Sequence, residues 1–296
     1  MSISPELHAL GTARQEARAA KDFALADKYR DEIATAGYEI IDIQGGFEFR
    51  EKSLVTVVDT IRGVKPFPKT DRDITVALVV NGFHADAIAS IDAIKLKSAC
   101  EIAVIATQEA SDLGSVVDSH THVIEVRTDP GWGESINALL KNITTPYVVV
   151  MDPSTIFTDD AISPVLEELK KGEYCAVGWR GGLINIEDQW RTVDDKGDGE
   201  VDVLFSYFMA LDRESAINAG SFNARALYYR NADIEFSLKL RHSAGRLLQM
   251  KLPLEQGRHH GYHDADPEFR EAASKKNYDR ILERFRGKEA ILSPRR

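Results

Sequence analysis

The chain has 296 residues, and its 47 Asp and Glu residues outnumber its 37 Lys and Arg residues, which gives a formal net charge of −10. This acidic balance argues against broad charge-driven binding to nucleic acid or to anionic membranes. Cys100 and Cys175 both lie in apolar runs, which predicts buried thiols in a reducing compartment rather than a disulfide. The opening MSISPELHAL lacks a basic stretch followed by an apolar one, and no run approaches about 18 apolar residues. We therefore expect no secretion signal, no transmembrane segment and a cytoplasmic location.

Residues 1–52 predict a small accessory unit of two helices and a β-hairpin. Asp22 is a plausible N-cap for the second helix, and Gly37 is placed to end it. Gly45 and Gly46 separate two short strand-like runs, as in a hairpin. The residues expected to face inward at helical spacing are Leu7, Leu10, Ala13 and Ala17 in the first helix and Phe23, Ala26, Tyr29 and Ile33 in the second.

Residues 53–72 predict a linker, because Pro66 and Pro68 lie among charged residues in this stretch. A second domain is then expected over residues 73–287, followed by a short tail over residues 288–296.

From Asp73 onward, continuous apolar runs alternate with segments of helical spacing. Runs such as ITVALVV and CEIAVIAT are typical of strands buried on both faces. Their alternation with helices predicts an α/β fold, with a layered sheet of mostly parallel strands flanked by helices. Ligands bind such sheets at the carboxyl ends of the strands. Four of those ends are expected to carry Asn81, Thr107, Arg127 and Asp152.

The second half is less regular. VDVLFSYFMALDR predicts one long apolar strand, in which Phe208 is expected to be a core residue. A helix is expected around Ile234 and Leu238, and a charged amphipathic helix near the end of the chain. Trp190 is open to either reading, because a tryptophan can stack on a sugar or pack in a core.

Three segments in this order resemble the nucleotide-sugar-dependent glycosyltransferases of family 2, which have the open GT-A nucleotide-binding fold. The first is TDPGWGESINALLKNITTPYVVVMDPST, in which Gly131, Gly133 and Asn137 match the family's glycine-rich turn and Asp152 matches the first acid of its D-x-D motif. The second runs from Val201 to Gly245 and looks like the acceptor half, and the third is the histidine-rich GRHHGYHDADPE. The resemblance implies transfer of a sugar from a nucleotide-diphospho-sugar to the hydroxyl of a glycan or small-molecule acceptor, with inversion expected at the anomeric carbon.

The resemblance also implies a divalent cation, Mn²⁺ or Mg²⁺, held by Asp152. Such an ion offsets the charge that develops on a departing diphosphate, and carboxylate oxygens are its preferred ligands. Ser154 replaces the second acid of the motif, so a distant histidine is expected to contribute, with His259 and His263 as the candidates and His260 beside them. Asn81, Thr107, Gly131, Gly133, Asn137 and Asp152 are the residues expected to bind the donor.

Asp233 is the expected catalytic base, since a carboxylate beside an acceptor hydroxyl can remove its proton. It matches the second position of the family's E-D pair, whose first position is Ala232 here. Glu235 is the nearby competitor, but residues two apart on a helix do not share a face, so only one of them should point into the site. A helix N-terminus favours an acid for structural reasons too.

Two alternatives remain open from the sequence. Ser154 and Ala232 are also compatible with a module that binds a nucleotide sugar or glycan without turnover. The segment ARQEARAAKDFALADKYRDEIATAGYEIIDIQGGFEF resembles the C-terminal appendage of bacterial cysteinyl-tRNA synthetases, which suggests a tRNA-associated accessory protein. Nucleic acid is not the expected partner, because the chain is acidic and no other synthetase segment is visible. The donor base, the sugar, the acceptor and the oligomeric state are left open.

Overall fold

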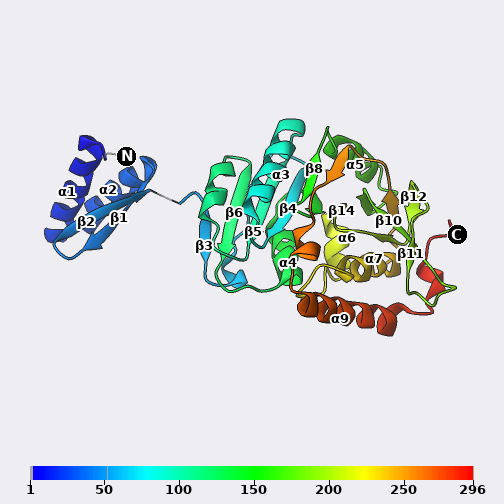
Figure 1. Cartoon of the computed structure of the whole chain (residues 1–296). Helices are drawn as coiled ribbons and strands as arrows, with labels where there is room; N and C mark the ends of the chain where they lie inside the picture. The colour runs from blue at the N-terminus through cyan, green and yellow to red at the C-terminus, as the bar shows by residue number, and fades with distance from the viewer. Residues whose placement is uncertain (1–2, 52, 296) are drawn as a thin grey trace. The chain divides into compact units, whose positions relative to one another are not determined.

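The computed structural model describes residues 3–51 and 53–295 and divides the chain into two compact units, Met1–Leu54 and Val55–Arg296. The smaller unit consists of α1 Pro5–Ala19, α2 Phe23–Thr35, β1 Tyr38–Ile43 and β2 Gly46–Glu51 (Figure 1). The two strands form an antiparallel hairpin across Gly45, as expected. Asp22 caps α2 by accepting a hydrogen bond of 3.0 Å from the backbone N–H of Leu25.

One of the inward-facing positions predicted for this unit is wrong. Phe23 is 63% exposed, and the buried residues of α2 are Ala26 and Ile33. An aromatic ring of the hairpin, that of Phe47, packs against α1 instead. It lies so close to Gly11 that a Cβ on this glycine would be 2.4 Å from the ring. Gly11 therefore leaves room for a ring from the opposite strand.

The larger unit is built on a nine-stranded sheet in the order β12-β15-β9-β14-β7-β4-β5-β6-β3. Neighbours from β3 to β7 are parallel, β14 runs antiparallel to both β7 and β9, and β15 is parallel to β9. Its strands are β3 Thr56–Val58, β4 Ile74–Val80, β5 Glu101–Ala106, β6 Thr121–Val126, β7 Tyr147–Met151, β9 Ala176–Gly178, β12 Gly199–Val201, β14 Phe208–Asp212 and β15 Leu247–Gln249. The predicted α/β class with mostly parallel strands is confirmed.

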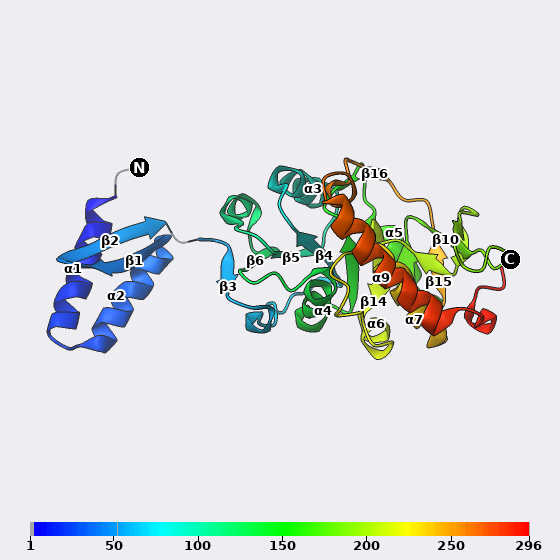
Figure 2. The same cartoon turned by 60° about the horizontal axis from the view of Figure 1, so that its bottom comes forward.

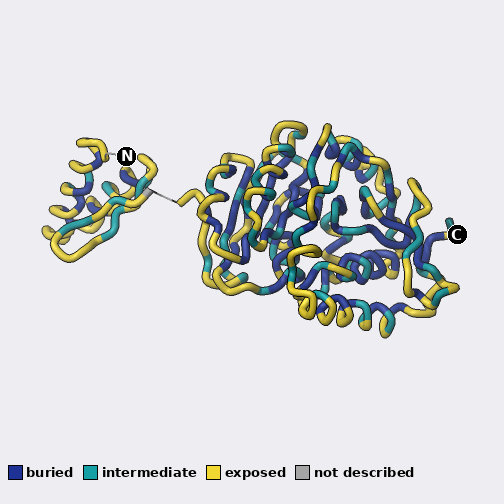
Figure 3. Tube along the Cα trace, viewed as in Figure 1, coloured by how far each residue is buried: buried dark blue, intermediate teal, exposed yellow. Residues whose placement is uncertain are grey.

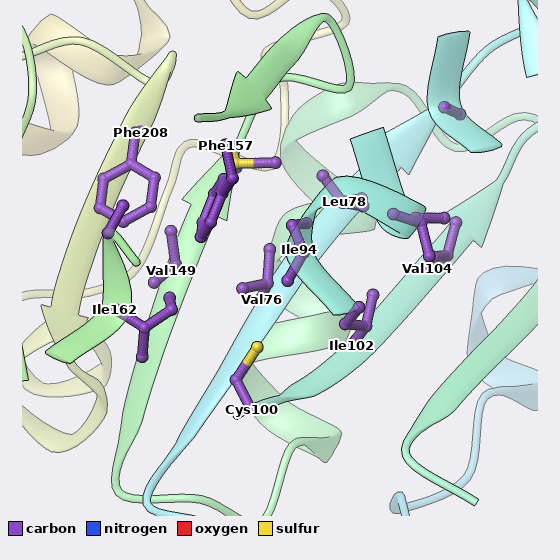
Figure 4. Close-up of a cluster of buried hydrophobic side chains, with 14 of the residues drawn as sticks. Val76, Leu78, Ile94, Cys100, Ile102, Val104, Val149, Phe157, Ile162 and Phe208 are labelled. Atoms are coloured by element: carbon purple, nitrogen blue, oxygen red, sulfur yellow. The ribbon is translucent and has the colours of Figure 1, made fainter. Parts of the chain in front are cut away.

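Helices cover both faces of this sheet. Alternate residues of β4 separate into two cores, with Val76 and Leu78 on one face and Ala77 on the other. Ile94 of α3 packs on the first face, together with residues of α5, as Figure 4 shows. The second face is covered by α4, α6 and α7 (Figures 1 and 3). These helices are α3 His84–Lys97, α4 Trp132–Asn142, α5 Ile162–Lys170, α6 Arg213–Asn218 and α7 Ala232–His242.

The long strand predicted over residues 201–213 is wrong, because the chain breaks it into three pieces. After β12 the chain leaves the main sheet, forms β13 Val203–Leu204, passes through residues 205–207, which belong to no strand, and returns to the main sheet as β14. β13 belongs to a small sheet with β10 Gly181–Ile184 and β11 Val193–Asp194. Phe208 is fully buried and Trp190 is 4% exposed, so both are core residues.

A third core lies between α7 and the last helix, α9 Pro267–Phe285, which runs beside α7 in Figures 1 and 2. The remaining elements are β8 Thr155–Phe157, β16 Leu254–Gln256, α8 His260–His263 and the short 3₁₀ turns η1 Ile61–Gly63, η2 Ser111–Val116 and η3 Glu289–Ile291. No helix within residues 3–51 and 53–295 is long and apolar enough to cross a membrane.

The predicted linker over residues 53–72 and the predicted tail over residues 288–296 are both corrected by the structure. Residues 56–58 form the edge strand β3, and Val64 and Phe67 are buried in the core of the larger unit. The two prolines flank Phe67, whose backbone N–H donates to the carbonyl of Asn142. Near the end of the chain, Leu292 is 6% exposed and packs in the third core.

Helix α3 offers a matched test of this packing. Ile94 is fully buried in the first core, whereas Leu96, two residues later, is 78% exposed. Ile94→Ala should lower the free energy of unfolding by about 2–5 kcal/mol, through lost transfer energy and a residual cavity. Leu96→Ala should change it by less than about 0.5 kcal/mol. Chemical denaturation of both variants measures this, and equal effects would contradict the assignment of this helix face.

Candidate active site

The ends of three neighbouring strands open onto one cavity of about 570 Å³. Asn81 follows β4, Thr107 follows β5 and Asp152 follows β7, and all three line the cavity. Arg127 follows β6 but does not belong to the described lining, and it pairs instead with Asp59. The predicted convergence at the strand ends is thus present for three of the four residues.

Ser154 positions Asp152. The backbone N–H and the hydroxyl of Ser154 both donate to Oδ1 of Asp152, and Nε2 of Gln256 donates to the serine Oγ at 2.6 Å. The serine hydroxyl is therefore engaged with its neighbours and fixes the orientation of the carboxylate. This leaves Oδ2 of Asp152 as the oxygen directed at other groups.

The chain returns to Asp152 through a short antiparallel pairing of β16 with β8. Gln256 lies opposite Thr155, and the N–H of Gly257 donates to the carbonyl of Ser154 at 2.8 Å. His259 follows two residues later, with its Nδ1 3.3 Å from Oδ2 of Asp152. The expected return of the histidine loop to this sheet edge is what the structure shows.

His259 has the properties of a neutral metal ligand. Burial lowers the pKa of its imidazole, and the charge of Asp152 opposes this shift. The residue is 7% exposed, and neither ring nitrogen has a hydrogen-bond partner among the described residues. A buried imidazole without partners beside a carboxylate is a donor set that suits a divalent cation. No group of three or more His, Cys, Asp and Glu side chains converges in the described part of the chain, so this site offers two protein ligands.

The other two histidines of the loop line the cavities but make different contacts. His260 forms ion pairs with Asp86 and Asp264 and stacks on Phe83, with ring centroids 3.9 Å apart. His263 lines a second cavity, of about 490 Å³, and the contact with Asp152 is made by His259. The role of His263 as a metal ligand stays a prediction.

Asp233 also lines this second cavity, near the start of α7. Its carboxylate accepts hydrogen bonds from the N–H of Ser206 at 3.0 Å and from that of Ile234 at 2.9 Å. Burial nevertheless raises its pKa to about 6, against the effect of these hydrogen bonds. Ser206 is available because the chain leaves the sheet between β13 and β14, the feature that interrupts the expected long strand.

Glu235 points away from the cavities. Its carboxylate accepts from Nδ2 of Asn223 and pairs with Arg280 at 3.2 Å. Only one of the two acids therefore faces a cavity, as the helical spacing predicts.

The two cavities meet. Asp152, Ser206, Tyr229 and His259 line both of them, which places the Asp152–His259 pair on their common boundary. A ligand in the first cavity and a ligand in the second would therefore meet beside this pair.

Gly131, Gly133 and Asn137 of the glycine-rich segment are absent from the described lining of both cavities. A Cβ on Gly133 would lie 2.2 Å from the carbonyl oxygen of Asn223, and Gly131 has a φ of +82° that favours glycine. Asn137 exchanges two hydrogen bonds of 3.0 Å with the backbone of Phe222. These three residues contact the loop 222–227, and their role in donor binding stays a prediction.

Several residues of the first cavity were not found from the sequence. Gln108, whose Nε2 donates to Oδ1 of Asn81 at 2.6 Å, is the direct neighbour of Thr107 and could have been found by its place at a strand end. The others lie on helix starts and loops that carry no distinctive pattern: Phe83, Asp86, Asp129 and Trp132.

Comparison with solved structures identifies the fold. The chain resembles GalNAc-T7 in its crystal structure with UDP, GalNAc and Mn²⁺, with a TM-score of 0.54 and 12% identity over 72% of this chain and 48% of that one. It also resembles the mannosyltransferase PcManGT from Pyrobaculum calidifontis in complex with GDP-Man and Mn²⁺, with a TM-score of 0.50 and 16% identity over 73% of this chain and 72% of that one. The chain thus spans about half the length of GalNAc-T7. No curated protein matches the sequence significantly.

The family model of glycosyl transferase family 2 matches residues 88–235, which is half of the chain and includes Asp152 and Asp233. Together with the mostly parallel sheet and the GT-A fold of the similar structures, this match shows that the chain belongs to glycosyl transferase family 2.

Proposed function

We propose that the protein transfers a sugar from a nucleotide-diphospho-sugar to an acceptor hydroxyl, with a divalent cation and with inversion at the anomeric carbon. The observation that carries this proposal is the meeting of two cavities at Asp152 and His259, with the carboxylate of Asp233 in the second cavity. A donor in the first cavity and an acceptor in the second would then have their reacting atoms at the shared boundary.

The charge of the first cavity supports a cation. Four carboxylates line it, those of Asp86, Asp129, Asp152 and Asp264, and its described lining holds no lysine or arginine. A diphosphate would be repelled there unless positive charge accompanied it. Asp152 and His259 would hold the cation, which when bound would offset the charge on the leaving diphosphate. Manganese accepts such a mixed oxygen and nitrogen donor set.

Asp233 supports the second half of the reaction. A carboxylate that lines the acceptor cavity can take the proton of an attacking hydroxyl, and a pKa near 6 makes it a stronger base than an ordinary aspartate while leaving it ionised at neutral pH. Direct attack by that hydroxyl on the face opposite the diphosphate gives inversion in a single displacement.

The hydroxyl of Ser154 orients Asp152, which is compatible with a catalytic site despite the missing second acid. The resemblance of residues 1–52 to the synthetase appendage stays a prediction, since the family match begins at residue 88.

The first test of this function is donor binding. A panel of UDP-, GDP- and dTDP-sugars with Mn²⁺ should contain at least one donor that raises the melting temperature of the protein, because ligands of the native state stabilise it. Asp152→Ala should remove the Mn²⁺-dependent part of that increase. Asp159→Ala, at an exposed position that does not line the cavities, is the matched control. An unchanged increase in Asp152→Ala would refute the metal assignment.

The second test addresses the base. Asp233→Asn keeps the size of the side chain but cannot accept the proton, so transfer to an acceptor should fall by at least about 100-fold. Mn²⁺-dependent binding of the donor should remain, since Asp233 is confined to the second cavity. The transfer rates of Asp233→Asn and wild type are measured side by side. Equal rates would show that another group removes the proton.

The third test is the pH dependence of transfer. Because the pKa of Asp233 is raised to about 6, the carboxyl is protonated and inactive below that pH, and the turnover rate should increase through pH 6 to a plateau. The same raised pKa affects stability in the opposite sense. Ionisation of the buried carboxyl costs the folded state about 3 kcal/mol as the pH rises from about 4 to about 6.

The stability of Asp233→Asn relative to wild type should therefore increase over that interval and then stay constant. Urea titrations of both proteins at a series of pH values measure this difference, which is independent of other groups that titrate equally in the two. A difference that stays flat between pH 4 and pH 7 would contradict the raised pKa.

A further inference from the structure

Two arginines stand at the second cavity without a neutralising partner. Arg230 lines the cavity, and its guanidinium carbon is 5.4 Å from the ring centroid of Tyr262. The guanidinium carbon of Arg180 lies 4.1 Å from the ring centroid of Trp179 and 5.4 Å from that of Tyr207, which is a wall of the cavity. Within the described residues, neither guanidinium takes part in an ion pair or a hydrogen bond.

The aromatic rings hold these cations without cancelling their charge. A guanidinium stacked on a ring keeps its N–H donors free at its edge, where a carboxylate or phosphate can bind in the plane. Arg241 and Arg246 differ in this respect, because both pair with Glu200. Arg180 and Arg230 are both exposed, and they lie at one cavity of a chain whose net charge is −10.

The described carboxylates that line the second cavity do not form ion pairs with these arginines. Its described lining has two carboxylates, Asp152 and Asp233. Asp152 is engaged with Ser154 and His259, and Asp233 accepts hydrogen bonds from Ser206 and Ile234. The positive charge is therefore directed at something that enters the cavity.

We propose that the acceptor carries an anionic group, a carboxylate or a phosphate, which Arg230 and Arg180 bind while the acceptor hydroxyl lies beside Asp233. This inference rests on the proposed function and adds the chemical class of the acceptor. An anionic acceptor would be repelled by the ionised base, and the two arginines offset that repulsion. The aromatic walls formed by Tyr207, Tyr229 and Tyr262 suit the apolar face of a sugar ring.

The arginines do not fit the alternative role of binding the donor diphosphate. Arg230 lines the second cavity, and Arg180 lies against the ring of Tyr207, which also lines it. The described lining of the first cavity includes neither arginine. The donor cavity is instead acidic, so the two cavities have opposite requirements for their ligands.

The test uses the full chain with Mn²⁺ and UDP or GDP, whichever binds, and compares glucuronate and glucose 6-phosphate with glucose by isothermal titration calorimetry. At least one of the anionic sugars should bind about tenfold more tightly than glucose. The double variant Arg180→Gln with Arg230→Gln should lose that preference. The matched control is Arg62→Gln with Arg286→Gln, which removes the same charge at two exposed positions outside the described lining of both cavities.

Each outcome decides the inference. A preference for glucuronate alone indicates a carboxylate acceptor, and a preference for glucose 6-phosphate alone indicates a phosphate. The inference is overturned if glucose binds as tightly as the anionic sugars or if neither anionic sugar binds. It is also overturned if the double variant still prefers the anionic sugar. Loss of nucleotide affinity in the double variant also overturns it, because the arginines would then serve the donor. Absence of Mn²⁺-dependent nucleotide binding in the wild type would instead overturn the proposed function.

Discussion

The site depends on one short contact between distant parts of the chain, the pairing of β8 with β16. Three residues on each side form the ladder, and the backbone bond from Gly257 to Ser154 extends it. This pairing fixes Gln256 beside Ser154 and places His259 against Asp152. Closing a loop of about 100 residues costs conformational entropy, which the pairing alone cannot offset. The burial of Phe157 and Leu254 in the first core supplies the remaining stabilisation.

The buried polar groups at this contact differ in how far they are satisfied. Ser154 and Gln256 are hydrogen-bonded to each other and to Asp152, so they form a rigid support. His259 has no hydrogen-bond partner within the described residues, and Asp233 is buried as an acid whose ionisation is disfavoured. His259 and Asp233 therefore lower the stability of the fold, and both lie where charge and protons would be handled. This contrast separates the groups that support the site from those that would react in it.

The strand ends could be predicted from the sequence because they follow from local patterns. Buried apolar runs mark β4, β5 and β7, and parallel strands bring their carboxyl ends to one edge, so Asn81 and Asp152 were found together. The close packing of Gly133 on the carbonyl of Asn223 could not be predicted, because this partner lies far away in the sequence and has no side-chain signature. The break in the strand that exposes Ser206 was missed for a related reason. The segment 205–207 contains Phe205 and Tyr207 and so continues the apolar run, whereas the pairing of β13 with β10 in a separate small sheet is a long-range contact.

The charges of the two cavities complement the chemistry that the fold would perform. The first cavity is lined by acids, so an anionic donor can be stable there only with a cation, and Asp152 and His259 stand where that cation would also touch the boundary with the second cavity. The second cavity is lined by the buried carboxylate of Asp233 and by Arg230, and Arg180 lies against its wall residue Tyr207. A negative base and positive binding groups at one cavity favour a ligand that has a neutral hydroxyl at one end and a negative group at the other. A ligand of this kind can bind in only one direction, because reversing it would place its negative group against Asp233 and its hydroxyl against the arginines. Electrostatics alone would then orient the acceptor hydroxyl toward the base, without a separate hydrogen bond for each group of the sugar.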